Sequence, residues 1–203
     1  MFKPSEQSMN QALLDQVSLS CLYFESGGLC NSAVVLTKDY AVTTLHCIPE
    51  EERKLGSTVL LRNTNGEHHN VKIHGLNRMS DYAVFKKDEG VFDSVPRKTY
   101  PSVLDRYIVA GFSFGEDKPS VRVGHISSLS SGSRGFFYGE SGGLPGYSGG
   151  GVYYARNGSL MGIARSSEWK GSETRRYGDV LEMISVQVIL NNIELFQDRP
   201  FSV

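Results

Sequence analysis

Residues 145–154 read PGYSGGGVYY, and this stretch decides how the rest of the chain is interpreted. It places Ser148 two residues after one glycine and directly before three more. Glycines around a serine in a loop are typical of tight turns. A serine that attacks a carbonyl carbon needs the same neighbours, because its hydroxyl must sit on a sharp turn and backbone N–H groups must face the developing oxyanion. The second interpretation requires a histidine base and an acid elsewhere in the chain.

A histidine and an aspartate that could serve Ser148 both stand upstream of it. His46 ends the apolar run AVTTLHCI, and Asp81 opens the strand-like run MSDYAVFK. Taken alone, each is explained as a structural residue, a packed histidine in one case and an acid at the start of a strand in the other. Together the three follow the order His, Asp, Ser, which is the order of the chymotrypsin-type triad.

Composition and charge narrow the class of protein. The chain has 203 residues and 39% hydrophobic content, enough for one large all-β unit or two small barrels. Lys and Arg number 21 against 22 Asp and Glu, so we expect no nucleic-acid partner. No apolar run is long enough for a membrane segment, and the polar N-terminus lacks the core of a secretory signal, so we expect a cytoplasmic location. No metal site and no cofactor are expected.

Short β-type runs separated by turn residues occupy most of the sequence. About six runs lie within residues 17–92, and about six more follow residues 93–104, which read as a linker because they hold two prolines and no clean period. Strands this short predict an all-β sandwich or barrels. Residues 8–16 predict a short amphipathic helix, and ISVQVILNNIELF at 184–196 predicts a C-terminal helix with Ser185 as its N-cap.

Several segments together resemble the trypsin/chymotrypsin-like serine protease superfamily. CNSAVVLTKDYAVTTLHC is similar to its histidine segment, MSDYAVFK to its acid segment, and GYSGGGVYY followed by NGSLMGIA to its Gly-X-Ser-Gly-Gly segment. IVAGFSFGEDKPSVRVGHISSL resembles the HtrA-like branch. The compact loops are closer to HtrA-like cores and to polyprotein-processing serine proteases of RNA viruses than to digestive trypsins. The resemblance covers residues 17–182.

The resemblance implies a fold and an activity. The fold would be all-β, two six-stranded antiparallel Greek-key barrels of the chymotrypsin type with a C-terminal helix. One barrel would span residues 17–92, and the other 105–203 after the linker at 93–104. The activity would be that of a serine endopeptidase acting on a peptide or protein, with polyprotein processing as one role. The location would be the host cytoplasm for a viral protein, and the oligomeric state is left open.

The resemblance also assigns roles to residues. Ser148 would be the nucleophile, His46 the general base and then acid, and Asp81 the carboxylate that orients the histidine. The oxyanion hole would use the backbone N–H groups of Gly146 and Ser148. A glycine at 146 suits this role, because its amide must turn inward in a conformation that a side chain resists.

The S1 pocket is partly readable by the same resemblance. Its base and wall would be formed by Ser141, Gly142, Gly143, Ala164, Arg165 and Ser166. No acid stands at the expected base, so a preference for Lys or Arg at P1 is not expected. Two alternatives stay open: a small apolar pocket for a medium or aromatic side chain, or Arg165 turned inward to read an acidic P1 by a charge-assisted contact. The first is favoured because strand arginines more often face solvent.

The three cysteines leave a question of redox state. The resemblance places Cys30 and Cys47 where the histidine-loop disulfide of the family usually lies. An odd number of cysteines behind a polar N-terminus favours free thiols instead. The sequence offers no disulfide partner for Cys21. It leaves open whether Cys30 and Cys47 form a disulfide or stay as free thiols.

Two other functions compete with the peptidase. A protease-fold binding module with a catalytically silent site would keep the same segments, because the presence of three residues does not establish their alignment. An esterase could use the same triad. A serine-directed probe separates the peptidase from the binding module, and turnover of peptides against simple esters separates it from the esterase.

Overall fold

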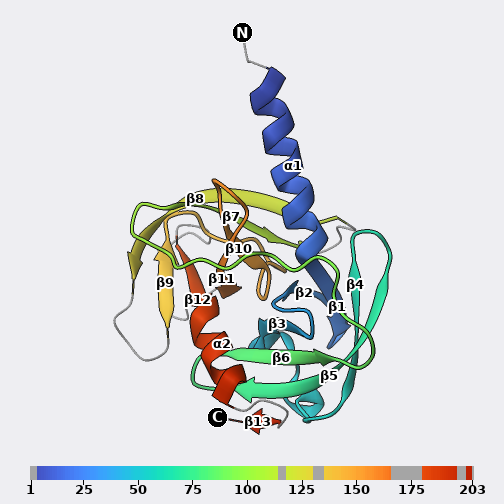
Figure 1. Cartoon of the computed structure of the whole chain (residues 1–203). Coiled ribbons are helices and arrows are strands. Elements are labelled where there is room, and N and C mark those ends of the chain that lie inside the picture. Colours follow the sequence, from blue (N-terminus) through green and yellow to red (C-terminus); the bar gives the residue numbers. More distant parts are fainter. Residues whose placement is uncertain (1–3, 114–117, 130–134, 166–179, 196–199, 203) are drawn as a thin grey trace.

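The computed structural model describes residues 4–113, 118–129, 135–165, 180–195 and 200–202. Strands dominate and gather into two barrels, and an N-terminal helix extends away from them (Figure 1). The predicted fold of two six-stranded antiparallel barrels with a C-terminal helix is confirmed.

The first barrel is built from the first six strands. These are β1 (Cys21–Ser26), β2 (Leu29–Val35), β3 (Tyr40–Thr44), β4 (Thr58–Asn63), β5 (His68–Asn77) and β6 (Tyr82–Lys87). They pair in the order β5-β4-β1-β2-β3-β6, and an additional pairing of β5 with β6 closes the barrel. In β1, Leu22 and Phe24 are buried, whereas Tyr23 and Glu25 between and after them are not, as the two-residue period of a strand requires.

The second barrel closes in the same way from the next six strands. These are β7 (Arg106–Gly111), β8 (Ser120–Leu129), β9 (Phe136–Gly139), β10 (Gly151–Tyr154), β11 (Leu160–Arg165) and β12 (Leu181–Ser185). Their order is β10-β11-β12-β9-β8-β7. The segment 93–104 between the barrels holds only an isolated bridge between Lys98 and Leu160. Tyr107, Val109, Phe137 and Met161 are among the buried residues of this barrel's core.

A separate apolar cluster joins the two barrels. Val34, Val42 and Val84 come from the first barrel, and Ala110, Phe112, Ile163 and Ile184 from the second. Full burial of side chains of this size stabilises a fold by about 1.5–3 kcal/mol each. The residues at the mouth of one barrel are therefore held in a fixed position against those of the other.

Helices border this cluster at both ends of the chain. Helix α1 (Pro4–Ser20) is longer than the predicted 8–16, so the first strand begins at Cys21 and not at residue 17, where the β-type runs were expected to begin. Packing explains the difference, because Val17 is buried in the inter-barrel cluster and Ser20 Oγ shares a hydrogen bond of 2.7 Å with Tyr153 OH.

The C-terminal helix follows the sequence prediction. Helix α2 (Val186–Leu195) buries Val186, Ile189 and Ile193, and Ser185 Oγ accepts a hydrogen bond from Gln187 N at 3.3 Å, as an N-cap does. Among the described residues, no helix is both long and apolar enough to span a membrane.

A last short strand belongs to the first barrel although it comes from the end of the sequence. Strand β13 (Phe201–Ser202) pairs in parallel with β5, next to Gly75 and Leu76. The chain therefore crosses back from the second barrel to the first (Figure 1).

Candidate active site

His46 lies in a single helical turn that follows β3. The turn is the 3-10 helix η1 (Leu45–Cys47), in which Ile48 N donates to Leu45 O over 3.0 Å. Leu45 and Cys47 point into the first barrel and are buried, so the residue between them points outward. The His46 side chain is 42% exposed.

Asp81 lies in the turn between β5 and β6, directly before β6. Its backbone has φ of 57°, in the left-handed region that aspartate tolerates better than most residues. The turn is braced by Asn77 Oδ1, which accepts a hydrogen bond from Ser80 N at 2.8 Å. Asp81 O in turn accepts from Leu45 N at 3.0 Å, which ties the acid's turn to the histidine's turn.

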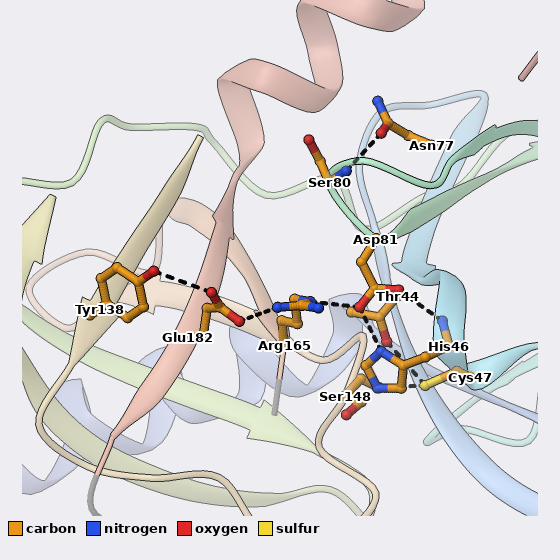
Figure 2. Close-up of polar contacts among 10 residues, drawn as sticks. All are labelled: Thr44, His46, Cys47, Asn77, Ser80, Asp81, Tyr138, Ser148, Arg165 and Glu182. Carbon is orange, nitrogen blue, oxygen red and sulfur yellow. Dashed lines mark hydrogen bonds and ion pairs between the residues drawn. The ribbon is translucent and has the colours of Figure 1, made fainter. Parts of the chain in front are cut away.

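The two side chains meet in the geometry expected of a histidine and its orienting acid. His46 Nδ1 lies 2.7 Å from Asp81 Oδ2, and Asp81 Oδ1 accepts from the backbone N of His46 at 3.1 Å (Figure 2). The Asp81 side chain is only 14% exposed. Both carboxylate oxygens are therefore engaged by the same residue.

Ser148 sits in the loop between β9 and β10, as the sequence predicts. Tyr147 N donates to Leu144 O at 3.0 Å, and Gly150 N donates to Tyr147 O at 2.8 Å, which makes two tight turns in succession. Gly149 has φ of 85°, and a Cβ there would collide with the carbonyl oxygen of Ser32. The glycines are thus required by backbone conformation and by the close approach of the first barrel.

Contacts across the two barrels bring the serine to the histidine. Cys47, the residue after His46, donates from Sγ to the carbonyl oxygen of Ser148 at 3.5 Å. Thr44 Oγ1 shares a further contact with Cys47 Sγ at 3.1 Å. Figure 2 draws Ser148 together with His46 and Cys47. The turn that carries His46 and the loop that carries Ser148 therefore meet at the junction of the barrels.

Gly146, which the resemblance assigns to the oxyanion hole, lies at a tightly constrained point of the serine loop. Its φ is 93°, and a Cβ there would collide with the backbone oxygen of Phe112. Its carbonyl oxygen accepts a hydrogen bond from Ser32 Oγ at 2.7 Å. This carbonyl is therefore turned toward the first barrel and held there.

Arg165 has a role that the sequence did not reveal. It turns inward from the end of β11, and Nε donates to Asp81 Oδ2 at 2.6 Å (Figure 2). Another nitrogen of the same guanidinium donates to Glu182 Oε2 on β12. Tyr138 OH donates to the second oxygen of Glu182 at 3.2 Å, and the guanidinium carbon lies 5.2 Å from the ring centre of Phe136. No local pattern marks this arginine, because its two partners are distant in sequence.

The charges of these groups shift one another's pKa. Burial lowers the pKa of His46, but the contacts with Asp81 and Cys47 outweigh burial and raise it above the ordinary 6.5. Burial raises the pKa of Asp81, but the hydrogen bonds and positive charges of His46 and Arg165 bring it below the ordinary 3.8. Asp81 is thus held ionised beside an imidazole that binds a proton more tightly than usual.

The structure describes five of the six residues predicted for the S1 pocket. Ser141 is clamped by Tyr107 OH, which donates to Ser141 O at 2.7 Å, and Gly142 is buried. A Cβ on Gly143 would lie 3.3 Å from Leu181 Cδ1. The wall residue Ala164 is buried.

The strand that carries Ala164 and the residue before Ser141 border the predicted S1 pocket. Ala164 N donates to Gly150 O at 2.8 Å, which ties the wall strand to the serine loop, and Ser166 lies outside the described residues. Glu140, the residue before Ser141, is exposed and paired with His125 at 2.6 Å.

The cysteines are free thiols in this structure. Cys30 is half-buried and packs against the inter-barrel cluster, whereas Cys47 belongs to the core of the first barrel. Among the described residues, no three His, Cys, Asp or Glu side chains gather as a metal site requires.

Comparison with known proteins relates this arrangement to peptidases. The family model of the trypsin-like peptidase domain matches residues 31–163. A serine endoprotease from Yersinia pestis aligns with a TM-score of 0.72 and 20% identity, over 92% of this chain and 65% of that one. The HtrA-type protease AlgW, solved with a tripeptide, aligns with a TM-score of 0.73 and 20% identity, over 93% of this chain and 64% of that one.

The two solved structures support a shared fold. At 20% identity the two solved structures share a fold with this chain, and the chain spans less than two thirds of the length of either. No curated protein matches the sequence at a significant level.

Proposed function

The chain belongs to the trypsin-like peptidase domain family, and on that premise we propose that it is a serine endopeptidase that cleaves peptide bonds through an acyl-enzyme on Ser148. The observation that carries the proposal is the 2.7 Å contact of His46 Nδ1 with Asp81 Oδ2 at the same junction where Ser148 is held. When Nδ1–H donates to the carboxylate, the other ring nitrogen is left as the base.

The residues then divide the chemistry among them. His46 takes the proton of Ser148 as its oxygen attacks the scissile carbonyl, and the carbonyl π electrons move onto oxygen. The amine leaves with the proton from His46, which gives an ester on Ser148. Water, deprotonated by His46, attacks that ester. The bond from the acyl carbon to the Ser148 oxygen then breaks, the carboxylic acid product leaves, and His46 returns the proton to Ser148. Asp81 stabilises the imidazolium in both halves and keeps its own negative charge.

The oxyanion would be held by the backbone N–H groups of Gly146 and Ser148. The positive φ of Gly146 and the hydrogen bond on its carbonyl oxygen support this role, because together they orient the peptide groups around the turn. Removing one such donor from a serine peptidase slows the chemical step by about 100- to 1,000-fold.

The described residues of the pocket favour a small or medium apolar P1 side chain. Gly142, Gly143 and Ala164 are small, and Leu181 adds an apolar surface beside them. Arg165 does turn inward, but its guanidinium is engaged by two carboxylates, which argues against its reading an acidic P1. The substrate is proposed to be a peptide or protein. Polyprotein processing and a cytoplasmic location stay predictions.

The test is labelling of the purified protein with a fluorophosphonate probe beside Ser148→Ala and His46→Ala. We expect the wild type to label and both variants to stay unlabelled, because the probe reports a serine activated by its base. A well-folded wild type that never labels would contradict the proposal and favour a protease-fold binding module. Turnover of a peptide library, compared with turnover of simple esters, by wild-type protein that has not met the probe then separates a peptidase from an esterase.

A further inference from the structure

The Asp81 carboxylate is shared between an imidazole and a guanidinium from different barrels. His46 Nδ1 lies 2.7 Å from Oδ2, and Arg165 Nε lies 2.6 Å from the same oxygen (Figure 2). We propose that Arg165 is a positioning residue of the active site, which holds the Asp81 carboxylate against His46 and offsets part of its negative charge. This inference rests on the proposed peptidase function.

Side chains of the second barrel hold the guanidinium of Arg165 in place. Glu182 is 9% exposed and accepts from the guanidinium with one oxygen and from Tyr138 OH with the other. Phe136 lies under the guanidinium. An arginine fixed on two sides loses little further freedom when it binds Asp81, and its planar donors can serve both carboxylates at once. Arg165 therefore links the Asp81 side chain, which comes from a turn of the first barrel, to strands β11 and β12 of the second barrel.

The turn that carries Asp81 does not by itself fix the orientation of the carboxylate, and Arg165 contributes to that orientation. Asp81 stands at a positive φ on a turn between two strands, and its side chain reaches across to another segment. Oδ1 is oriented by the backbone N of His46, and Oδ2 by the imidazole and Arg165 together. Without Arg165, the orientation of the carboxylate would depend on His46, the group that the carboxylate has to orient.

The charges around His46 determine the expected change in pH dependence. The titratable and charged groups that face it are Cys47 on its own turn, Asp81, and then Arg165 with Glu182 behind the acid. A carboxylate beside an imidazole favours the protonated ring, and a cation on that carboxylate opposes it. Because the base must be unprotonated, removing Arg165 moves the acid limb of activity to higher pH.

The experiment measures the rate constant of fluorophosphonate labelling between pH 5 and pH 10 for the wild type, Arg165→Met and Arg165→Lys. We expect Arg165→Met to shift the acid limb upward by about one pH unit and to lower the rate at pH 7 by about tenfold. Arg165→Lys keeps the charge and should keep the limb within about 0.3 unit of the wild type, because the position of the limb depends on that charge. A limb that stays in place in Arg165→Met overturns the proposal, even if the rate falls.

A second variant covers the case in which Arg165→Met does not fold. Glu182→Gln removes the anion that shares the guanidinium, so the arginine's charge acts on Asp81 alone and the acid limb should move to lower pH. An unmoved limb in Glu182→Gln, with the wild-type melting temperature retained, also overturns the proposal. A wild type that labels at no pH refutes the peptidase function itself, which is a different result from an unmoved limb.

Discussion

Ser32 Oγ, on β2 of the first barrel, donates a hydrogen bond of 2.7 Å to the carbonyl oxygen of Gly146, in the serine loop of the second. Ser32 Oγ also accepts a hydrogen bond from Phe112 N at 2.8 Å. The backbone oxygen of Ser32 accepts one from Thr43 Oγ1 at 2.7 Å. One small side chain therefore joins the two barrels at the turn proposed to bind the oxyanion.

Replacing Ser32 with alanine should weaken both the fold and the site. The change leaves Phe112 N–H and Gly146 O without this partner in a buried place, a loss worth about 1–3 kcal/mol of unfolding free energy. We expect fluorophosphonate labelling to slow by about tenfold, since a shift of about 1.4 kcal/mol in the barrier has that effect. Denaturant unfolding and labelling kinetics measure the two effects. Ser102→Ala, at an exposed serine, is the control, and equal behaviour of the two variants would contradict the prediction.

A side chain at position 146 should abolish most of the activity. Gly146→Ala meets two obstacles, a φ of 93° and a collision with the backbone oxygen of Phe112. The loop must shift, and with it the proposed oxyanion donors, so labelling should slow by about 100-fold or more. Gly90→Ala is the matched control, because Gly90 has φ of 69° and open space around it. That variant should lose about 1 kcal/mol of stability and none of its labelling rate.

Much of this architecture could be predicted from the sequence, because the signals are local. Short β-type runs and turn residues indicated the barrels, and the motifs around His46, Asp81 and Ser148 indicated the superfamily, which family membership confirms. The glycines of the serine loop are also visible in the sequence, and the positive φ of Gly146 and Gly149 is a local reason for them.

The features that the sequence did not predict depend on partners distant in the chain. The resemblance places Arg165 on a pocket wall, and a strand pattern cannot tell which carboxylate its side chain meets. The sequence predicts β-type runs from residue 17 and not a helix that continues to Ser20, because Val17 and Ser20 are explained only by contacts with the inter-barrel cluster and Tyr153. Strand β13 has two residues, too few for any period to show.

That last strand supports a prediction about stability without activity. Phe201 is buried at 4% exposure, against Gly75 and the ring of His74. Phe201→Ala should lower the unfolding free energy by about 3 kcal/mol, the lower part of the range for a buried phenylalanine. The labelling rate of the folded variant should stay at the wild-type value, because the strand bonds to β5 and not to the serine loop. A large loss of labelling in a fully folded variant would show that β13 also supports the site.

Removing the charge of Asp81 should stop catalysis while the protein stays folded. Asp81→Asn cannot stabilise the imidazolium and presents an amide to an imidazole and a guanidinium that both donate. Loss of this acid in a serine peptidase lowers the rate by about 10,000-fold. Asp39→Asn, at an exposed aspartate, is the control and should keep full activity. Labelling of Asp81→Asn within tenfold of the wild type would contradict the assigned role of the acid.

The contacts of His46 should make stability and activity respond oppositely to pH. Its folded-state pKa is raised above the ordinary 6.5 by Asp81 and Cys47, so its contribution to stability is fully present below pH 6.5. That contribution is lost as the pH rises through the folded pKa, whereas labelling increases there because the base becomes unprotonated. Unfolding free energies of the wild type and His46→Ala, measured from pH 6 to pH 10, should therefore converge as the pH rises. A gap that widens with pH would mean that His46 is held neutral in the folded protein and that Asp81 does not favour its protonated form.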